Sequence, residues 1–399
     1  MNLTGPQFKQ LHEALLDAFR SRAELDRLAL FQLGENLARW AAVTTPLSDT
    51  AFQLIQWAAA HDRLSDLILG AHRENRDNQQ VRRLAGELDL PALTAPETQV
   101  MICLMGEQPL PNLLPILHYH PAAVVLVHSD YTAPVAHNVQ QLLDGTITVQ
   151  RQEVDAYAIE DARQALRSVI AQSGWRAAEL MFNVTGGTKP MSLAAYRVAQ
   201  DLPGCALIYM QTSGGHSECY EYQLTGTAFT LQRNKPRTIR TVLNIDLHLR
   251  AHGLVGRHGG APDPTTPHSV SVHAVAEALA GYVEEQQTWL TVAPDGPVAL
   301  DLIVRCGNQL GLIAVRPGGP AHALDGLRDL NTLGSREYLG IYVKRFLIVD
   351  QALPVPTQEA AAMRSATVLV LAGLATGVLS EDDKTRLRKQ VMADLGGCS

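Results

Sequence analysis

"FNVTGGTKPMSLAAY", residues 182–196, joins an apolar run to a helix-like segment through a polar corner with two glycines and one lysine. Gly186 and Gly187 permit positive φ and a close approach of the backbone to a ligand, and Pro190 suits the first turn of a helix. Free N–H groups at the start of such a helix favour an anion. The spacing is neither that of a Walker A loop nor that of a dinucleotide fingerprint. The stretch therefore predicts a strand–turn–helix corner suited to a phosphate, without P-loop hydrolysis; alone, it is equally explained as a plain connection.

The segments around this corner predict a parallel sheet. Five short runs rich in Val, Ile, Leu and Met alternate with helix-like stretches between residues 96 and 215, and a hairpin is expected through residues 219–233. In such sheets ligands bind beyond the carboxyl ends of the strands. The corner follows one strand, and "MGEQPLPNLLPI", residues 105–116, follows another. We therefore expect both loops at one ligand-binding edge.

Composition limits the class of protein. The chain has 399 residues, of which 46% are hydrophobic and 18% charged, which is enough for roughly three domains. A net charge of −7 argues against a broad basic surface for long nucleic acid but allows a local anion pocket. Without an 18-residue apolar span or an export signal, we expect a cytoplasmic protein with no membrane partner. Five cysteines without a C-x-x-C pair predict reduced thiols and no zinc site.

The N-terminal part, residues 1–90, predicts a compact bundle of about six short helices. Two helix starts are marked by capping boxes, one formed by Thr4 and Gln7 and the other by Ser21 and Glu24. This all-α part differs in pattern from the rest of the chain. It is therefore expected to be a separate domain.

The C-terminal part predicts a second α/β domain over residues 269–399, after a Gly/Pro-rich connector at residues 233–268. Its expected order is helix, strand, strand, helix and strand, at residues 271–286, 298–306, 309–317, 326–334 and 345–350. The fold class is therefore multi-domain, with an all-α part followed by two α/β parts.

The corner has the pattern N-x-T-G-G-T-K-x-M, which resembles the ligand-loop signature of CARF domains (CRISPR-associated Rossmann fold), the cyclic-oligoadenylate sensors of type III CRISPR systems. The positions that carry this pattern are Asn183, Thr185, Gly186, Gly187, Thr188, Lys189 and Met191. The first loop looks like the other half of the pocket through Gly106, Gln108, Pro109, Pro111 and Asn112. "HSD" ends the second strand as in the same family, which adds Ser129 and Asp130.

This resemblance covers residues 96–232 and implies a Rossmann-like ligand-sensing domain. It implies a homodimer that binds the ring on its two-fold axis, where each subunit offers the same groups to a ring with an even number of repeats. Cyclic tetra-adenylate fits that symmetry. No cofactor is implied besides this ligand.

The C-terminal part resembles the PD-(D/E)xK restriction-endonuclease-like fold that follows CARF domains in one group of CRISPR effectors. Asp301 matches the first metal ligand, but Ala314 stands where the family has a metal-binding Glu and Arg316 where it has a Lys. Alanine cannot ligate Mg²⁺ or Mn²⁺, and arginine cannot act as a base. We therefore expect a degenerate nuclease with no catalytic residues and no bound metal, in which these three positions are vestigial.

Segments of the helical part, "LTGPQFKQLHEALLDAF", "LDRLALFQLGENL" and "FQLIQWAAAHDRLSDLI", resemble the effector-associated, death-like domains of modular bacterial defence proteins. That resemblance implies pairing with a similar domain on a separate effector, such as a protease. The preferred hypothesis is an adaptor that senses cyclic oligoadenylate and recruits this effector.

Two alternatives remain open on sequence alone. The first is a ligand-activated, metal-dependent nuclease in which a carboxylate from elsewhere replaces the missing ligand; the candidates are Glu277, Glu284 and Glu337, which are otherwise expected on the solvated surface. The second is slow ring cleavage in the CARF pocket, which requires only a ribose 2′-OH held in line with its phosphate.

Overall fold

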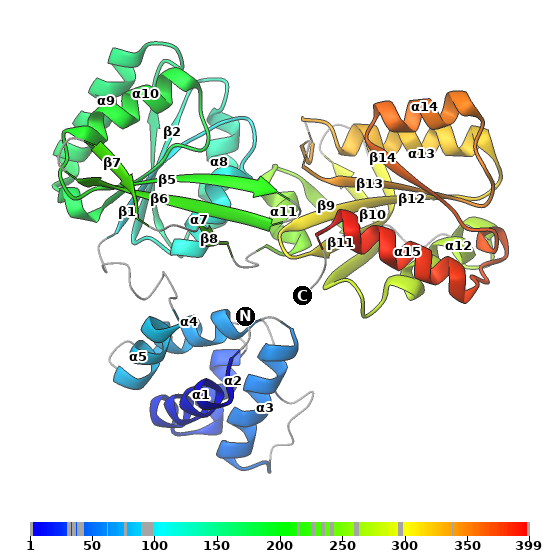
Figure 1. Cartoon of the computed structure of the whole chain (residues 1–399), viewed down its shortest axis with the longest axis horizontal. Coiled ribbons are helices and arrows are strands. Elements are labelled where there is room, and N and C mark those ends of the chain that lie inside the picture. Colours follow the sequence, from blue (N-terminus) through cyan, green and yellow to red (C-terminus); the bar gives the residue numbers. More distant parts are fainter. Residues whose placement is uncertain are drawn as a thin grey trace. The chain divides into compact units, whose positions relative to one another are not determined.

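The computed structural model divides into two units, Met1–Thr98 and Gln99–Cys398, each of which is described by itself (Figure 1). The residues that it describes are 3–29, 33, 37, 44–61, 63–75, 78–88, 99–213, 216–225, 228–232, 236–239, 243–258, 263–293, 298–336, 338–340 and 342–396.

The first unit is helical, as predicted. Its described helices are α1 (Gly5–Ala18), α2 (Arg22–Leu28), α3 (Leu47–Ala60), α4 (Leu64–Glu74) and α5 (Gln79–Glu87). Both predicted capping boxes are confirmed, at Thr4 with Gln7 and at Ser21 with Glu24. Apolar residues from all five helices form one buried core. The sixth predicted helix, at residues 35–43, falls almost entirely outside the described residues.

The second unit begins with a mostly parallel sheet of order β3-β2-β1-β4-β5-β6-β7, with β8 paired to β6. The first five strands run parallel, and β6 and β7 form the predicted antiparallel hairpin. The bounds are β1 (Val100–Leu104), β2 (Ala123–His128), β3 (Thr148–Glu153), β4 (Leu180–Asn183), β5 (Ala206–Ser213), β6 (His216–Thr225), β7 (Ala228–Leu231) and β8 (Arg237–Thr238).

Helices cover both faces of this sheet. Met101 and Cys103 of β1 pack in the core that holds α7 (Leu110–Tyr119) and α8 (Ala133–Leu143). Ile102 and Leu104 point to the opposite face, because side chains alternate along a strand. There they pack with α9 (Ile159–Ser173) and α10 (Lys189–Gln200), which lie side by side in Figure 1. A short 3-10 turn, η3 (Ala177–Glu179), precedes β4.

The helices that follow β1 and β4 therefore lie on opposite faces, and these two strands are neighbours in the sheet. Their carboxyl ends form the topological switch point at which open α/β sheets bind ligands. Both loops expected to bind ligand follow these two ends.

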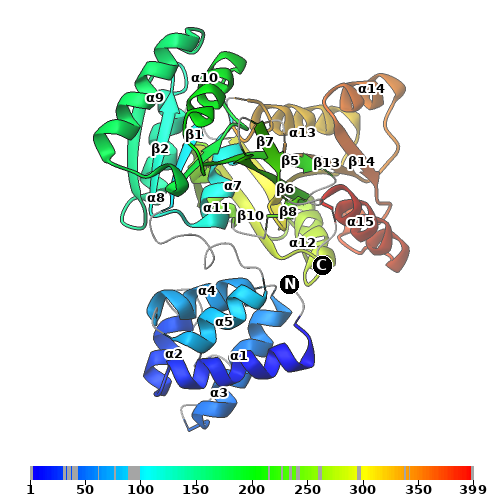
Figure 2. The ribbon, with the colours of Figure 1, turned by 60° about the vertical axis from the view of Figure 1, so that its left-hand side comes forward.

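The second sheet has the order β14-β13-β12-β11-β10-β9. Its strands are β9 (Val255–His258), β10 (Glu285–Ala293), β11 (Val298–Cys306), β12 (Gln309–Arg316), β13 (Lys344–Val349) and β14 (Ala366–Val370). Helices α13 (Pro320–Leu333) and α14 (Val355–Met363) lie on one side of the sheet and α12 (Pro267–Leu279) and α15 (Glu381–Asp394) on the other (Figure 2). The remaining elements are α11 (Ile245–Ala251) and η4 (Leu374–Thr376).

Two expectations about the C-terminal part need correction. The predicted helix 271–286 is too long: α12 ends at Leu279, Gly281 takes a left-handed φ of 77°, and β10 begins at Glu285. The left-handed glycine ends the helix because other residues adopt that conformation at a cost. The predicted connector at 233–268 contains α11 and also β9, which pairs with β10.

The cysteines are partly as expected. Cys103, Cys205 and Cys219 are free and buried, and burial raises the pKa of Cys205 to about 11 and that of Cys219 to about 12. Cys306 is disulfide-bonded, so the expectation of a reduced thiol is wrong there. Within the described ranges, no helix has both the length and the apolar character that crossing a membrane requires.

Candidate ligand-binding site

Two buried asparagines lock the loops after β1 and β4 together. Asn183 Nδ2 donates to Asn112 Oδ1 at 2.9 Å and to the Pro111 carbonyl at 2.9 Å. Asn112 Nδ2 donates in turn to the carbonyl of Leu104, the last residue of β1, at 2.8 Å. Both asparagine side chains are fully buried. These two predicted site residues therefore position the loops, because their amides are used inside the protein.

Thr185 extends this network to β5. Its amide and hydroxyl both donate to Asn183 Oδ1, at 3.1 and 2.6 Å. The hydroxyl also accepts the amide of Met210 at 2.7 Å. The turn after β4 is thus hydrogen-bonded to the end of β4 and to β5.

The glycines are required by the contact between the two loops. A Cβ on Gly186 would lie 2.2 Å from the Leu104 carbonyl oxygen. Gly187 has a φ of +71°, and its Cβ would lie 2.9 Å from the Leu104 side chain; a Cβ on Gly106 would lie 3.2 Å from the Gly187 amide. The structure thus gives these glycines a scaffold role, whereas the sequence suggested an approach to ligand, which stays a prediction.

Helix α10 begins as the sequence predicted. Thr188 is its N-cap and accepts the amide of Met191 at 3.3 Å, while its hydroxyl donates to the Ala156 carbonyl. Pro190 lies in the first turn, and Met191 is buried in the core. Lys189, the first residue of the helix, is exposed and has no acidic partner in the part of the chain that the structure describes. It is a free cation at the positive end of a helix dipole.

The loop after β2 contributes Ser129 and Asp130. The buried Ser129 donates its amide to Thr132 Oγ1 at 3.0 Å, so it holds its own loop. Asp130 is exposed and accepts the amide of Tyr131 at 2.7 Å. Its carboxylate lies at the same edge as Lys189 and disfavours an anion on its own side of that edge.

The loop after β1 contacts the second sheet domain. Pro109 precedes α7 as its N-cap residue. Gln108 lies against Gly340, whose added Cβ would lie 1.8 Å from Gln108 Oε1. Among the described residues, neither the nitrogen nor the oxygen of this enclosed amide has a hydrogen-bond partner. Glu107 and Arg336 lie 3.6 Å apart beside it, both largely exposed.

The predicted set therefore divides into two groups. Most members hold the loops; Lys189 and Asp130 face solvent. Three supporting groups were not predicted from the sequence, namely Thr132, the Ala156 carbonyl and the Met210 amide. The spacing of Ser129 and Thr132 carries a turn signal that could have been found, whereas backbone groups have no sequence signal.

At the second predicted site, both carboxylate oxygens of Asp301 contact other groups of the protein. Asp301 Oδ2 accepts the Val315 amide at 2.7 Å and also contacts Arg316 Nη1. Asp301 Oδ1 lies 3.0 Å from His268 Nε2. Arg316 donates its other amino group to Asp329 at 2.7 Å. Burial raises the pKa of Asp329, and the hydrogen bond from Arg316 opposes that rise.

Ala314 and Arg316 lie on the side of the sheet that α13 covers. A Cβ on Gly326 of α13 would lie 2.8 Å from the Arg316 side chain and 3.3 Å from Ala314, which is fully buried. The described residues contain no group of three or more His, Cys, Asp or Glu side chains that could hold a metal. The Arg316 guanidinium thus lies against the Asp301 carboxylate.

Two of the three alternative carboxylates, Glu277 and Glu284, lie within the described residues. Glu277 is exposed on α12, and Glu284 pairs with Arg305 at 2.5 Å. Glu337 lies outside the described residues.

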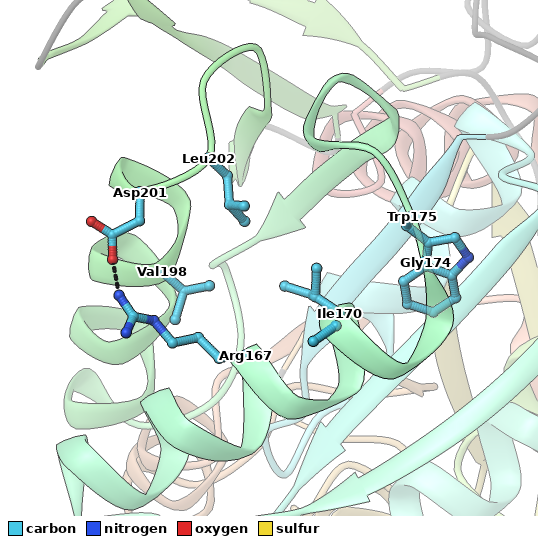
Figure 3. Close-up of a pocket in the computed structure, with 8 residues that line it drawn as sticks. Arg167, Ile170, Gly174, Trp175, Val198, Asp201 and Leu202 are labelled. Atoms are coloured by element: carbon cyan, nitrogen blue, oxygen red, sulfur yellow. Dashed lines mark hydrogen bonds and ion pairs between the residues drawn. The ribbon is translucent and has the colours of Figure 1, made fainter.

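A cavity of about 450 Å³ lies elsewhere, beside the carboxyl ends of α9 and α10 (Figure 3). An ion pair between Arg167 and Asp201 spans its side, and Trp175 and Leu202 line it. Because α10 starts at the ligand edge and this cavity lies at its other end, the cavity is separate from the predicted ligand loops.

The strand order and the paired loops at the switch point define a Rossmann-like α/β domain. Residues 100–242 match the family model "Card1 CARF domain", and residues 1–89 match "Effector-associated domain 1". The chain thus carries an effector-associated domain 1 at its N-terminus and a Card1-type CARF domain in its centre. No curated protein sequence matches the chain significantly.

Two solved structures resemble most of the chain in fold. Can2 from Sulfobacillus thermosulfidooxidans, in complex with cyclic tetra-adenylate, aligns with a TM-score of 0.55 at 14% identity, covering 75% of this chain and 97% of Can2. Protein VC1899 from Vibrio cholerae aligns with a TM-score of 0.58 at 13% identity, covering 76% of this chain and 100% of VC1899. At these identities the likeness concerns the fold alone.

Proposed function

We propose that this protein is a receptor for cyclic oligoadenylate, most suitably cyclic tetra-adenylate, and acts as an adaptor in type III CRISPR antiviral defence. The observation that carries the proposal is the exposed Lys189 at the start of α10, without an acidic partner among the described residues. The match to the Card1 CARF family and the cyclic tetra-adenylate of Can2 support the choice of ligand.

The chemistry of the site suits a phosphate. In the first turn of α10, Pro190 has no N–H and the amide of Met191 donates to Thr188, so the backbone N–H of Lys189 is the one left without a partner among the described residues. The Lys189 side chain adds a full positive charge at the same point. In a homodimer, two copies of this edge would meet a ring of even symmetry. The asparagine and glycine contacts keep the loops fixed, so little ordering is needed when the ring binds.

The N-terminal domain supplies the output in this proposal. Residues 1–90 would form the six-helix, death-like bundle, consistent with the effector-associated domain 1 match over residues 1–89. A similar domain on a separate effector, for example a protease, is the proposed partner. The sensor would occupy residues 96–232.

The C-terminal sheet would be a restriction-endonuclease-like domain, residues 269–399 after the connector 233–268, that has lost catalysis. Support comes from the contacts of Asp301, both of whose oxygens meet groups of the protein itself. Mn²⁺ or Mg²⁺ would have to displace Arg316 to reach this carboxylate. The domain would then transmit the ligand signal without cutting nucleic acid.

The proposal is tested by removing the free cation. Lys189→Ala deletes a charge-assisted contact worth about 1.5–3 kcal/mol, so calorimetry should show cyclic tetra-adenylate binding at least about tenfold more weakly. Arg151→Ala, which removes an exposed cation from β3 of the same sheet, is the matched control and should bind like wild type. Equal affinities of Lys189→Ala and wild type would refute the assignment.

The nuclease hypothesis is tested on the same preparation. Protein saturated with cyclic tetra-adenylate and given Mn²⁺ should leave single-stranded DNA, single-stranded RNA and plasmid uncut. Cutting that disappears in Asp301→Ala would establish the nuclease instead. Linear products appearing from the ring itself would point to ring cleavage in the CARF pocket.

A further inference from the structure

Tyr157 is a large aromatic side chain that is left in solvent. Its side chain is 80% exposed and follows β3, whose carboxyl end lies at the same edge of the sheet as the candidate ligand site. Single exposed apolar residues are common, so exposure alone assigns nothing. The position of this ring relative to the free cation is what distinguishes it.

A hydrogen bond joins the loop of Tyr157 to the start of α10. Thr188, the N-cap residue, donates its hydroxyl to the carbonyl of Ala156. Tyr157 directly follows Ala156, and Lys189 directly follows Thr188. The tyrosine ring and the lysine cation therefore project from adjoining backbone segments. Tyr131, also exposed at 72%, has no such bond to α10 among the described contacts.

The backbone of this loop is held in place before any ligand arrives. Asp155 Oδ1 accepts the amides of Tyr157 and Ala158 at 2.8 and 3.3 Å, and the Asp155 amide donates to Asp161 at 3.3 Å. These bonds also occupy one carboxylate oxygen of Asp155, the nearest acidic group along the chain. A fixed backbone presents the ring at a small entropic cost.

We infer that Tyr157 is the platform on which a purine base of the ligand stacks, while Lys189 neutralises a phosphate beside that base. Aromatic side chains commonly stack on the bases of single-stranded nucleic acids, and every base has a face to offer. A cyclic oligoadenylate carries one base and one phosphate in each repeat. The aromatic side chain of Tyr157 and the cation of Lys189, on adjoining segments, therefore match one repeat. This inference rests on the proposed function and adds a second contact to it.

The test distinguishes the contribution of the Tyr157 aromatic ring to binding from that of its hydroxyl. In the full-length protein, Tyr157→Ala should weaken cyclic tetra-adenylate binding about tenfold or more, whereas Tyr157→Phe should stay within about threefold of wild type. Tyr282→Ala, an exposed tyrosine that follows α12, is the control and should match wild type. In a cyclic tetra-adenylate with one adenine replaced by 2-aminopurine, the fluorescence of that base should be quenched by wild type and by Tyr157→Phe, and less by Tyr157→Ala.

The outcomes also separate this inference from the proposed function. If Lys189→Ala weakens binding but Tyr157→Ala binds and quenches like wild type, stacking is refuted and the phosphate site stands. If wild type itself does not bind the ring, both fall. Light scattering gives the remaining check. If the Tyr157→Ala protein is monomeric where wild type is dimeric, the tyrosine side chain belongs to a subunit contact, and the inference is overturned.

Discussion

The carboxyl edge of the first sheet and the Asp301 site of the second sheet treat charge in opposite ways. At the first edge, neutral amides and hydroxyls hold the loops, and Lys189 is left exposed without an acidic partner among the described residues. At the second, Asp301 meets Arg316, His268 and a backbone amide, and Arg316 also meets Asp329. A free cation suits an external anion, whereas an internally paired carboxylate has little to offer a metal.

Breaking the internal pair should have the largest effect. Asp301→Ala leaves the largely buried Arg316 with Asp329 as its remaining acidic partner, and should cost about 3 kcal/mol or more of unfolding free energy. Urea denaturation of the full chain would measure it.

Asp325→Ala is the matched control, because Asp325 is 62% exposed and pairs with the exposed Arg328, so its loss should cost less than about 1 kcal/mol. Equal losses of unfolding free energy in the two variants would contradict a stabilising pair between Asp301 and Arg316. So would stabilisation of wild type, but not of Asp301→Ala, by Mn²⁺.

Two histidines at the end of α11, the buried His248 and the half-buried C-cap residue His252, give a third case, in which both side chains are uncharged at neutral pH. Burial lowers the pKa of His252 from 6.5 to about 4, and burial together with the charges of His252 and Arg305 lowers that of His248. The unfolded chain therefore binds more protons between these pKa values, so stability is fully present above pH 6.5 and is lost as pH falls toward 4. For His252 alone the loss approaches about 3 kcal/mol.

Urea midpoints at pH 7.5, 6.5 and 5.5 would show this dependence, and His252→Gln should flatten it. The window above pH 5 matters because the carboxyl groups with lowered pKa, such as Glu24 and Glu160, titrate below it. An unchanged slope in His252→Gln would show that another group carries the pH dependence.

Gln108 tests whether a buried amide at the ligand edge destabilises the free protein and gains its hydrogen bonds only when ligand binds. Its enclosed amide lacks a hydrogen-bond partner in the described structure, so Gln108→Leu should stabilise the free protein by about 1 kcal/mol. The same change should weaken ring binding if the amide serves the ligand. Thermal melts and calorimetry would give the two values, with the exposed Gln150→Leu as control. A destabilised variant with unchanged affinity would make Gln108 part of the scaffold only.

The sequence predicted the elements better than their contacts. The start of α10 could be predicted because Pro190 is a local signal for the first turn of a helix, and this is confirmed; the cap by Thr188 was not predicted. The bond between Asn112 and Asn183 joins residues 71 positions apart and has no local signal. The first two residues of β10, Glu285 and Gln286, are predicted as the end of a helix, because no local signal marks the pairing with β11 that decides their structure.

The Asp301 site shows the same limit. That Ala314 offers no oxygen to a metal could be predicted from residue type alone. The contact of Arg316 with Asp301, and the contact of Gly326 with Ala314, depend on how α13 packs on the sheet. Such packing is set by the whole domain, so no short stretch of sequence reveals it.

The most direct measurement of the central claim is a calorimetric titration of the full-length protein with cyclic tetra-adenylate, in parallel with Lys189→Ala. We predict saturable binding of one ring for every two chains, at least about tenfold weaker in the variant. The absence of saturable binding to wild type, or one ring per chain with the same affinity in both proteins, would contradict the account.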